Sequence, residues 1–169
     1  MKKMRSLKFL KKDILIFITG LALVSYPVIS NYMESREQAS QIDTYNSSVN
    51  ELSSANKQLV LNEAYQWNNS LYSKQKGLSE DSGLEYENVL DLGNGVIGTV
   101  EIPKIKVNMP VYHGTDSDVL NVGAGHLEDS SLPVGGNNTH TVLTGHRGLP
   151  SSKLFTRLDE LKKGDRFFY

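Results

Sequence analysis

The residue best suited to catalysis in this sequence is His146, near the end of the segment His140-Thr-Val-Leu-Thr-Gly-His-Arg-Gly148. Thr141 to Thr144 has the β-branched and apolar residues typical of a short buried strand. Gly145 and Gly148 give the following turn backbone freedom. Because an imidazole gains or loses a proton near neutral pH, a histidine held at a strand end is suited to acid–base chemistry. An ordinary polar residue between a strand and a loop explains the same segment.

Other reactive groups are scarce. The four histidines (His113, His126, His140 and His146) are separated by 13, 14 and 6 residues, which matches no short-range zinc motif, and the sequence contains no cysteine. No serine stands in a nucleophile motif, and no phosphate-binding loop is present. We therefore expect no bound metal and no cofactor. His113 and His126 are expected to make structural hydrogen bonds.

Motifs on both sides of His146 resemble the first half of a class C sortase, the type that polymerises pilins. They are Ile102-Pro-Lys-Ile105, Pro110-Val-Tyr-His-Gly114, Gly125-His-Leu-Glu-Asp-Ser-Ser-Leu-Pro-Val-Gly-Gly136 and Gly148-Leu-Pro-Ser-Ser-Lys-Leu-Phe155. The resemblance extends from about Gly95 to Tyr169 and implies a β-barrel of which this sequence supplies the early strands. We therefore expect a mainly β fold: an incomplete sortase-type β-barrel, preceded by an N-terminal transmembrane helix and one or two polar helices.

The resemblance also implies a mechanism. In that family a cysteine thiolate attacks the Thr–Gly bond of an L-P-x-T-G sorting signal, and a lysine of the next pilin resolves the acyl-enzyme. The family's catalytic histidine falls on His146, whereas its cysteine and late-strand arginine have no counterpart here. Arg147, Arg157 and Arg166 do not match that arginine. We expect a sortase portion that ends before its nucleophile and is inactive alone. A membrane-anchored, non-catalytic extracytoplasmic binding or structural module is the alternative.

Residues 1–30 have the pattern of a membrane anchor. Six of the 18 basic residues precede Ile14–Ser30, a run of 17 residues without a charge. Basic residues before an apolar span favour a cytoplasmic N-terminus, so we expect a single-pass membrane protein with an exported body. The resemblance to class C sortases implies that this body faces the cell wall. A cleaved signal peptide is the alternative. The body after the span is acidic, which argues against nucleic acid as a partner. Pilin subunits with sorting signals and acceptor lysines are the partners that the resemblance implies.

Residues 31–76 form a polar, helix-permissive region. Its apolar residues recur at spacings of three and four, and their phase slips near Ser53-Ser54, which predicts two helices. Residues 77–95 are loop-like. In class C sortases this region carries a lid anchored by an Asp-Pro-aromatic motif, and the nearest counterpart is Asp81, without the proline or the aromatic residue. A solvated linker explains residues 77–95 equally well.

Residues 96–169 change to a β-rich pattern. Short runs of β-branched residues predict strands, and a set of leucines and Phe155 on one face predicts an amphipathic helix. The predicted elements are strands at 96–102, 107–112 and 141–144, a helical turn at 116–121, a helix at 151–161 and the start of a strand at 166–169.

Overall fold

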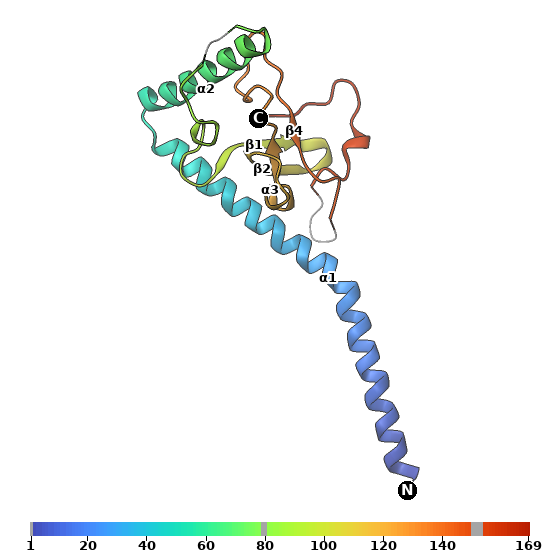
Figure 1. Cartoon of the computed structure of the whole chain (residues 1–169). Coiled ribbons are helices and arrows are strands. Elements are labelled where there is room, and N and C mark those ends of the chain that lie inside the picture. The colour runs from blue at the N-terminus through green and yellow to red at the C-terminus, as the bar shows by residue number, and fades with distance from the viewer. Residues whose placement is uncertain (1, 79–80, 150–153) are drawn as a thin grey trace.

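The protein consists of a long N-terminal helix that leads into a small body of helices and sheet (Figure 1). The computed structural model describes residues 2–78, 81–149 and 154–169, with side chains from residue 11 onward. Its helices are α1 (Lys2–Glu51), α2 (Ser54–Gln75) and α3 (Ser117–Val122). Three short 3₁₀ helices are η1 (Tyr86–Asn88), η2 (Pro103–Ile105) and η3 (Leu158–Glu160).

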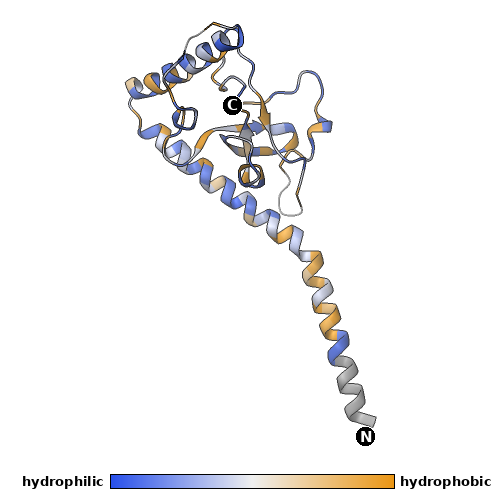
Figure 2. Ribbon diagram, viewed as in Figure 1, coloured by the Kyte–Doolittle hydropathy of each residue, from blue (hydrophilic) through white to orange (hydrophobic). Residues whose placement is uncertain are grey.

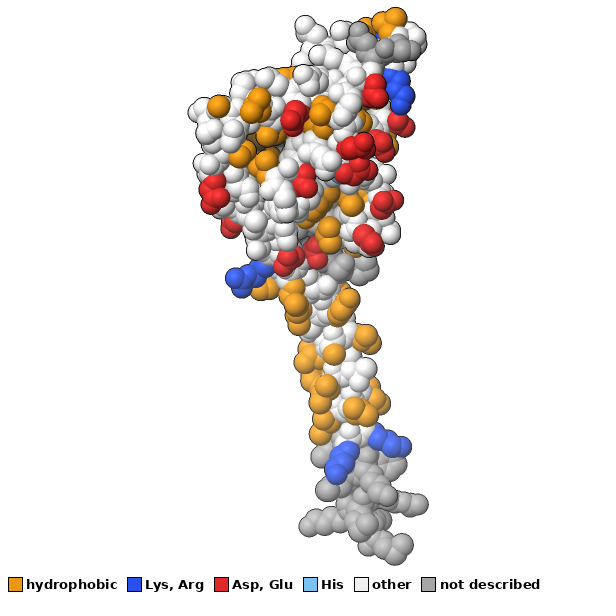
Figure 3. All heavy atoms as spheres, turned by 60° about the vertical axis from the view of Figure 1, so that its left-hand side comes forward, with side chains coloured by type: hydrophobic (Ala, Val, Ile, Leu, Met, Phe, Trp, Pro, Cys, Tyr) orange, Lys and Arg blue, Asp and Glu red, His pale blue; other side chains and the backbone are white. Residues whose placement is uncertain are grey.

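Residues 14–30 of α1 are mostly apolar and stand clear of the body. Figure 2 shows orange turns along this stretch, and Figure 3 shows apolar side chains around it. Within the described residues it is the one helix long and apolar enough to cross a membrane, and none of its most apolar window is buried. A membrane anchor and a signal sequence share this length and composition, so both readings of residues 1–30 agree with it.

The second half of α1 continues directly into the body. The helix is unbroken from the apolar run across residues 30 and 31, although Pro27 lies inside it. It ends at Glu51, and α2 begins at Ser54, which confirms the predicted break near Ser53-Ser54. The Ser53 side chain caps α2 by accepting a hydrogen bond from the Asn56 N–H at 3.1 Å. Such a cap satisfies one of the backbone donors that the first helical turn leaves unpaired.

Four strands form an open mixed sheet in the order β1-β2-β3-β4. They are β1 (Val96–Ile102), β2 (Val107–His113), β3 (Ala124–His126) and β4 (Leu143–Thr144). β1 and β2 pair antiparallel across η2, β2 and β3 are parallel with α3 between them, and β3 and β4 are antiparallel. The predicted strands at 96–102 and 107–112 and the helical turn at 116–121 are confirmed. The predicted strand at 141–144 is shorter and half-buried.

The hydrophobic core lies between the sheet, α2 and the segment that joins them. Ala64 of α2 and Val111 of β2 are fully buried, and α1 contributes Ile42. The remaining buried apolar residues of the main cluster come mostly from β1, β2 and the loops around them: Tyr86, Val89, Leu90, Ile97, Val100, Ile102, Ile105, Val107, Met109, Ala124, Leu132, Leu154 and Phe155. The sheet therefore packs on a hydrophobic core, although its four strands do not close into a barrel.

Two expectations about the fold are wrong. The chain is not mainly β, because α1 and α2 contain 50 and 22 residues whereas the longest strands contain seven. The described part of the predicted helix at 151–161 forms turns and η3, and residues 150–153 lie outside the described residues. Leu154 has a left-handed φ of 32° and is buried with Phe155, so tertiary packing overrides the helical pattern there.

The C-terminal residues add to the free edge of β1. Phe168 exchanges two backbone hydrogen bonds with Glu101, at 3.0 and 2.8 Å. Tyr169 donates a hydrogen bond from its hydroxyl to the Ile97 carbonyl at 3.1 Å, and its ring lies where a side chain on Gly98 would otherwise project. The predicted strand start at residues 166–169 thus appears as a single bridge.

Candidate active site

The position of His146 follows from the pairing of β3 and β4. Gly125 and His126 of β3 lie opposite Thr144 and Leu143 of β4, and His146 follows two residues after that pairing ends. Its side chain is half-buried. Within the described residues the imidazole makes no hydrogen bond or ion pair. The strand therefore leads to a partly accessible imidazole at the edge of the sheet, and its catalytic role stays a prediction.

The turn around His146 is held from the other side by Phe155. The Phe155 N–H donates a hydrogen bond to the His146 carbonyl at 3.1 Å. The Phe155 ring lies so close to Gly145 that a Cβ there would sit 2.9 Å from a ring carbon. Gly148 has a φ of 145°, a conformation that favours glycine. Gly145 thus allows the close contact with Phe155, and Gly148 allows the backbone conformation of the turn.

Arg147 is exposed and forms an ion pair with Asp159 of η3. Its guanidinium lies 3.1 Å from the Asp159 carboxylate, and the two side chains are 74% and 64% exposed. An ion pair this open to water contributes about 0–1 kcal/mol to stability. Nothing in this geometry gives Arg147 the role of the late-strand arginine of sortases, in agreement with the sequence analysis.

A buried hydrogen-bond cluster supports β3 behind the turn. His126 is fully buried, and its Nε2 lies 2.9 Å from the Ser131 carbonyl and 3.2 Å from Ser130 Oγ. The carbonyl requires Nε2 to carry the proton, so Nδ1 accepts from the Tyr86 hydroxyl at 2.8 Å. Burial lowers the pKa of His126, which favours this neutral form.

Tyr86 is the centre of the cluster. Its hydroxyl also lies 2.9 Å from the His126 carbonyl and accepts a hydrogen bond from the Gly114 N–H at 3.2 Å. Burial raises the pKa of Tyr86 to about 12. Its ring packs edge-on against His113, whose Nε2 donates to the Val89 carbonyl at 2.8 Å. The predicted structural hydrogen bonds of His113 and His126 are confirmed, whereas Tyr86 was not predicted.

Asn68 joins α2 to the loop between β3 and β4. Its side-chain amide donates to the Leu132 carbonyl at 3.0 Å, and its side-chain oxygen accepts from the Leu132 N–H at 2.7 Å. Asn68 is only 3% exposed. This double hydrogen bond fixes the loop that returns to β4. The sequence marks Asn68 only by its place on the apolar face of α2, one residue after Trp67.

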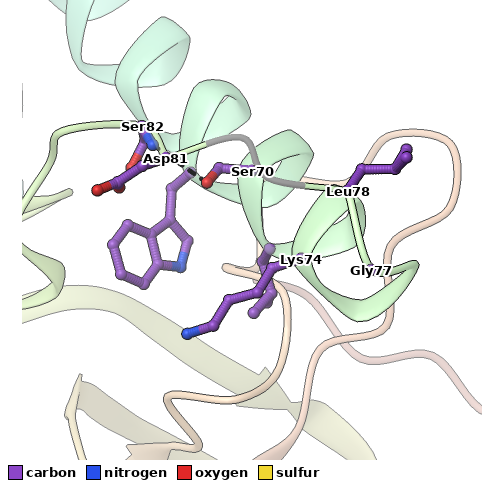
Figure 4. A pocket seen from close by; sticks show the side chains of 8 residues that line it. Ser70, Lys74, Gly77, Leu78, Asp81 and Ser82 are labelled. Atoms are coloured by element: carbon purple, nitrogen blue, oxygen red, sulfur yellow. Dashed lines mark hydrogen bonds between the residues drawn. The ribbon is translucent and has the colours of Figure 1, made fainter.

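Asp81 lies in a different part of the molecule from the turn that carries His146. Its carboxylate accepts the Gly83 N–H at 3.1 Å, and the next residue, Ser82, donates its backbone N–H to Ser70 of α2. The segment lines a pocket of about 520 Å³ over α2, whose lining also includes Trp67 (Figure 4). His146 is not among the lining residues. The structure thus places Asp81 against α2, and its role as a lid residue stays a prediction.

Among the described residues, the remaining histidine and the acidic residues form no metal-binding cluster. His140 is exposed at the start of the segment that leads to β4. No three His, Asp or Glu residues within the described ranges converge in a way that would hold a metal ion. Next to β4, the side chain suited to acid–base chemistry is the imidazole of His146.

Comparison with known proteins identifies the fold. The sortase domain family matches residues 100–169. The crystal structure of sortase C1 from Streptococcus agalactiae is 40% identical, with a TM-score of 0.67 over 75% of this chain and 67% of that chain. Sortase C of Streptococcus pneumoniae is 40% identical, with a TM-score of 0.63 over 75% of this chain and 65% of that one. The chain belongs to the sortase family, and these likenesses place it with the class C sortases.

Curated relatives match over different lengths. Sortase D of Bacillus subtilis is 45% identical over 69 residues, which are 41% of this chain and 32% of that protein. Sortase A of Streptococcus agalactiae is 27% identical over 159 residues, which are 92% of this chain and 60% of that protein. The chain thus spans between about a third and three fifths of the length of these curated relatives.

Proposed function

We propose that this chain provides the membrane anchor, the helical region and the acid–base histidine of a class C sortase that joins pilin subunits. The observation that supports it most is the position of His146 just after β4. The chain that carries it has 40% sequence identity to sortase C1 and a similar fold. A related sortase C structure is described in terms of pilin substrate specificity. The proposed substrates are pilins with L-P-x-T-G signals and acceptor lysines.

In this proposal His146 transfers protons at two stages. It protonates the amine that leaves when the Thr–Gly bond breaks, and it later removes a proton from the lysine amine that attacks the acyl-enzyme. The Phe155 N–H donates a hydrogen bond to the His146 carbonyl and so holds this residue at the edge of the sheet. From this half-buried position the imidazole would reach an extended peptide. The nucleophilic thiolate has to come from outside these residues, because the sequence contains no cysteine.

The proposed location is the outer face of the cell membrane. The apolar half of α1 would span the bilayer, with Lys11 and Lys12 on the cytoplasmic side and the sheet outside. This topology brings the body to the surface where pilins with sorting signals arrive. Protease added to intact cells should remove epitopes beyond Asn31, and a fully protected body would contradict the topology.

The catalytic role is tested by completing the enzyme. The full chain is extended with the part of Streptococcus agalactiae sortase C1 that follows the matched region, then incubated with an L-P-x-T-G peptide and an amine. Mass spectrometry should detect cleavage between Thr and Gly, and His146→Ala should reduce the rate by about 10²–10⁴-fold. His140→Ala is the matched control, because His140 is exposed on the same segment and should have little effect.

The chain without this extension should show no cleavage above the buffer rate. Acid–base assistance alone does not replace an attacking group, and the sequence places no serine in a nucleophile motif. Cleavage that His146→Ala abolishes in the unextended chain would show that another residue is the nucleophile. An extended chain that folds and cleaves equally well without His146 would favour a non-catalytic, membrane-anchored module.

A further inference from the structure

A polar cleft lies between α1 and the start of β2, close to the point where the apolar run ends. It encloses about 200 Å³. Its lining comes from three turns of α1, from the start of β2 and from Leu154: Asn31, Ser35, Gln38, Lys106, Asn108, Met109 and Leu154. Ligand pockets usually enclose about 300–1,000 Å³, so this cleft suits a small polar group rather than a whole drug-sized molecule.

Lys106 gives the cleft a positive charge. It follows η2 with a left-handed φ of 56°, and its N–H bonds to the Pro103 carbonyl at 3.1 Å, so the backbone of this turn is fixed. Within the described residues its ammonium has no ion-pair partner. Lys104, two residues earlier, is paired with Asp165 at 2.6 Å. The charge of Lys104 is therefore neutralised by Asp165, whereas the charge of Lys106 is available to the cleft.

The cleft lies at the depth of lipid headgroups if α1 spans a membrane. Ile14–Ser30 is about 26 Å long at 1.5 Å per residue, close to the hydrocarbon thickness of about 30 Å. The headgroup layer beyond it is about 5–8 Å thick, or about three to five helical residues. Asn31 and Ser35 occupy that interval. Tyr32 lies beside them and is 62% exposed, as expected of a tyrosine at a membrane interface.

We propose that this cleft binds the phosphate of an anionic phospholipid headgroup in the outer leaflet, with Lys106 as its cation and Asn108 as a hydrogen-bond donor. The proposal rests on the membrane anchoring proposed above. It follows from the charge of Lys106, the small polar volume and the depth of the cleft. Bound lipid would hold the sheet against the bilayer at the N-terminal end of β2.

Native mass spectrometry of the full chain released from nanodiscs tests this proposal. The nanodiscs contain equal amounts of phosphatidylglycerol and phosphatidylcholine. The chain should retain phosphatidylglycerol in preference to phosphatidylcholine. Lys106→Gln should reduce this retention about fivefold, because one lysine near an anionic surface contributes about 1 kcal/mol, which is about a fivefold change. Asn108→Asp, which adds a negative charge to the same wall, should reduce it as well.

Lys104→Gln is the matched control, because it removes the same charge from the same turn outside the cleft. It should leave lipid retention unchanged. Equal losses in Lys104→Gln and Lys106→Gln, or equal retention of the two lipids by the unaltered chain, would overturn the proposal. Displacement of the lipid by millimolar inorganic phosphate would overturn the assignment to a lipid. A chain absent from the nanodiscs would contradict the membrane anchoring itself, which separates that failure from failure of the site.

Discussion

Replacement of Tyr86 by phenylalanine should weaken the body more than any conservative change on its surface. The substitution keeps the ring against His113 and removes one oxygen. That oxygen contacts His126 Nδ1 at 2.8 Å, the His126 carbonyl at 2.9 Å and the Gly114 N–H at 3.2 Å. His126 is fully buried, so water does not replace the lost partner there.

The expected loss can be worked from these contacts. A buried donor or acceptor left without a partner costs about 1–3 kcal/mol. The change leaves His126 Nδ1 and the Gly114 N–H unpaired, and Gly114 is only half-buried. We therefore expect the free energy of unfolding to fall by about 2–4 kcal/mol. With a urea dependence of about 2 kcal/mol per molar, the midpoint should fall by roughly 1–2 M.

The assay uses the single tryptophan of the chain. Trp67 lies 5.6 Å from Tyr86, measured between ring centroids, so its fluorescence reports on this cluster during urea unfolding of the full chain in detergent. Tyr65→Phe is the matched control. Its hydroxyl makes one exposed hydrogen bond to the Val134 carbonyl at 3.3 Å, so its removal should cost less than about 0.5 kcal/mol. Midpoints for the two variants that agree within error would refute the account of the cluster.

Three further predictions concern the supports of the site. Asn68→Ala should lower stability by about 1–3 kcal/mol, because it leaves the buried Leu132 N–H without a partner, whereas the Leu132 carbonyl keeps its hydrogen bond from the Val134 N–H; urea unfolding measures the loss. Burial lowers the pKa of His126 and of His113, so the unfolded chain binds more protons, and stability should be complete above about pH 6.5 and fall below it. Unfolding midpoints that stay constant from pH 7.5 to about pH 5 would contradict this. Ser53→Ala should lower the thermal midpoint through a loss of about 1 kcal/mol at the cap of α2, whereas an unchanged midpoint would show that the cap is dispensable.

Local chemistry made part of the fold predictable. The break near Ser53 follows from the phase of the apolar residues, and β1 and β2 follow from β-branched runs around Pro103. These features depend on neighbours in the sequence. The position of His146 was predictable for the same reason, because its strand and its flanking glycines are contiguous.

Features that depend on distant partners were missed. Ala124–His126 has little intrinsic strand preference and becomes β3 because β2 and β4 pair with it on both sides. The close approach of the chain to β2 just before β3 requires glycine, because a Cβ on Gly123 would lie 2.6 Å from the Pro110 carbonyl oxygen. Phe155 has the spacing of a helical residue, yet its contact with Gly145 determines its conformation. Tyr86 and Asn68 carry no local signal for the partners they find.

The unbroken course of α1 ties the orientation of the body to that of the apolar run. About 20 residues of α1 lie beyond Asn31, a rigid length of about 30 Å, and this part packs against β1 and β2. Without a flexible tether, any tilt of the apolar half turns the whole body with it. A tilt of about 20° would move the far end of α1 sideways by about 10 Å. In the proposed topology, the interfacial side chains that set such a tilt would thereby also set the orientation of the sheet relative to the bilayer.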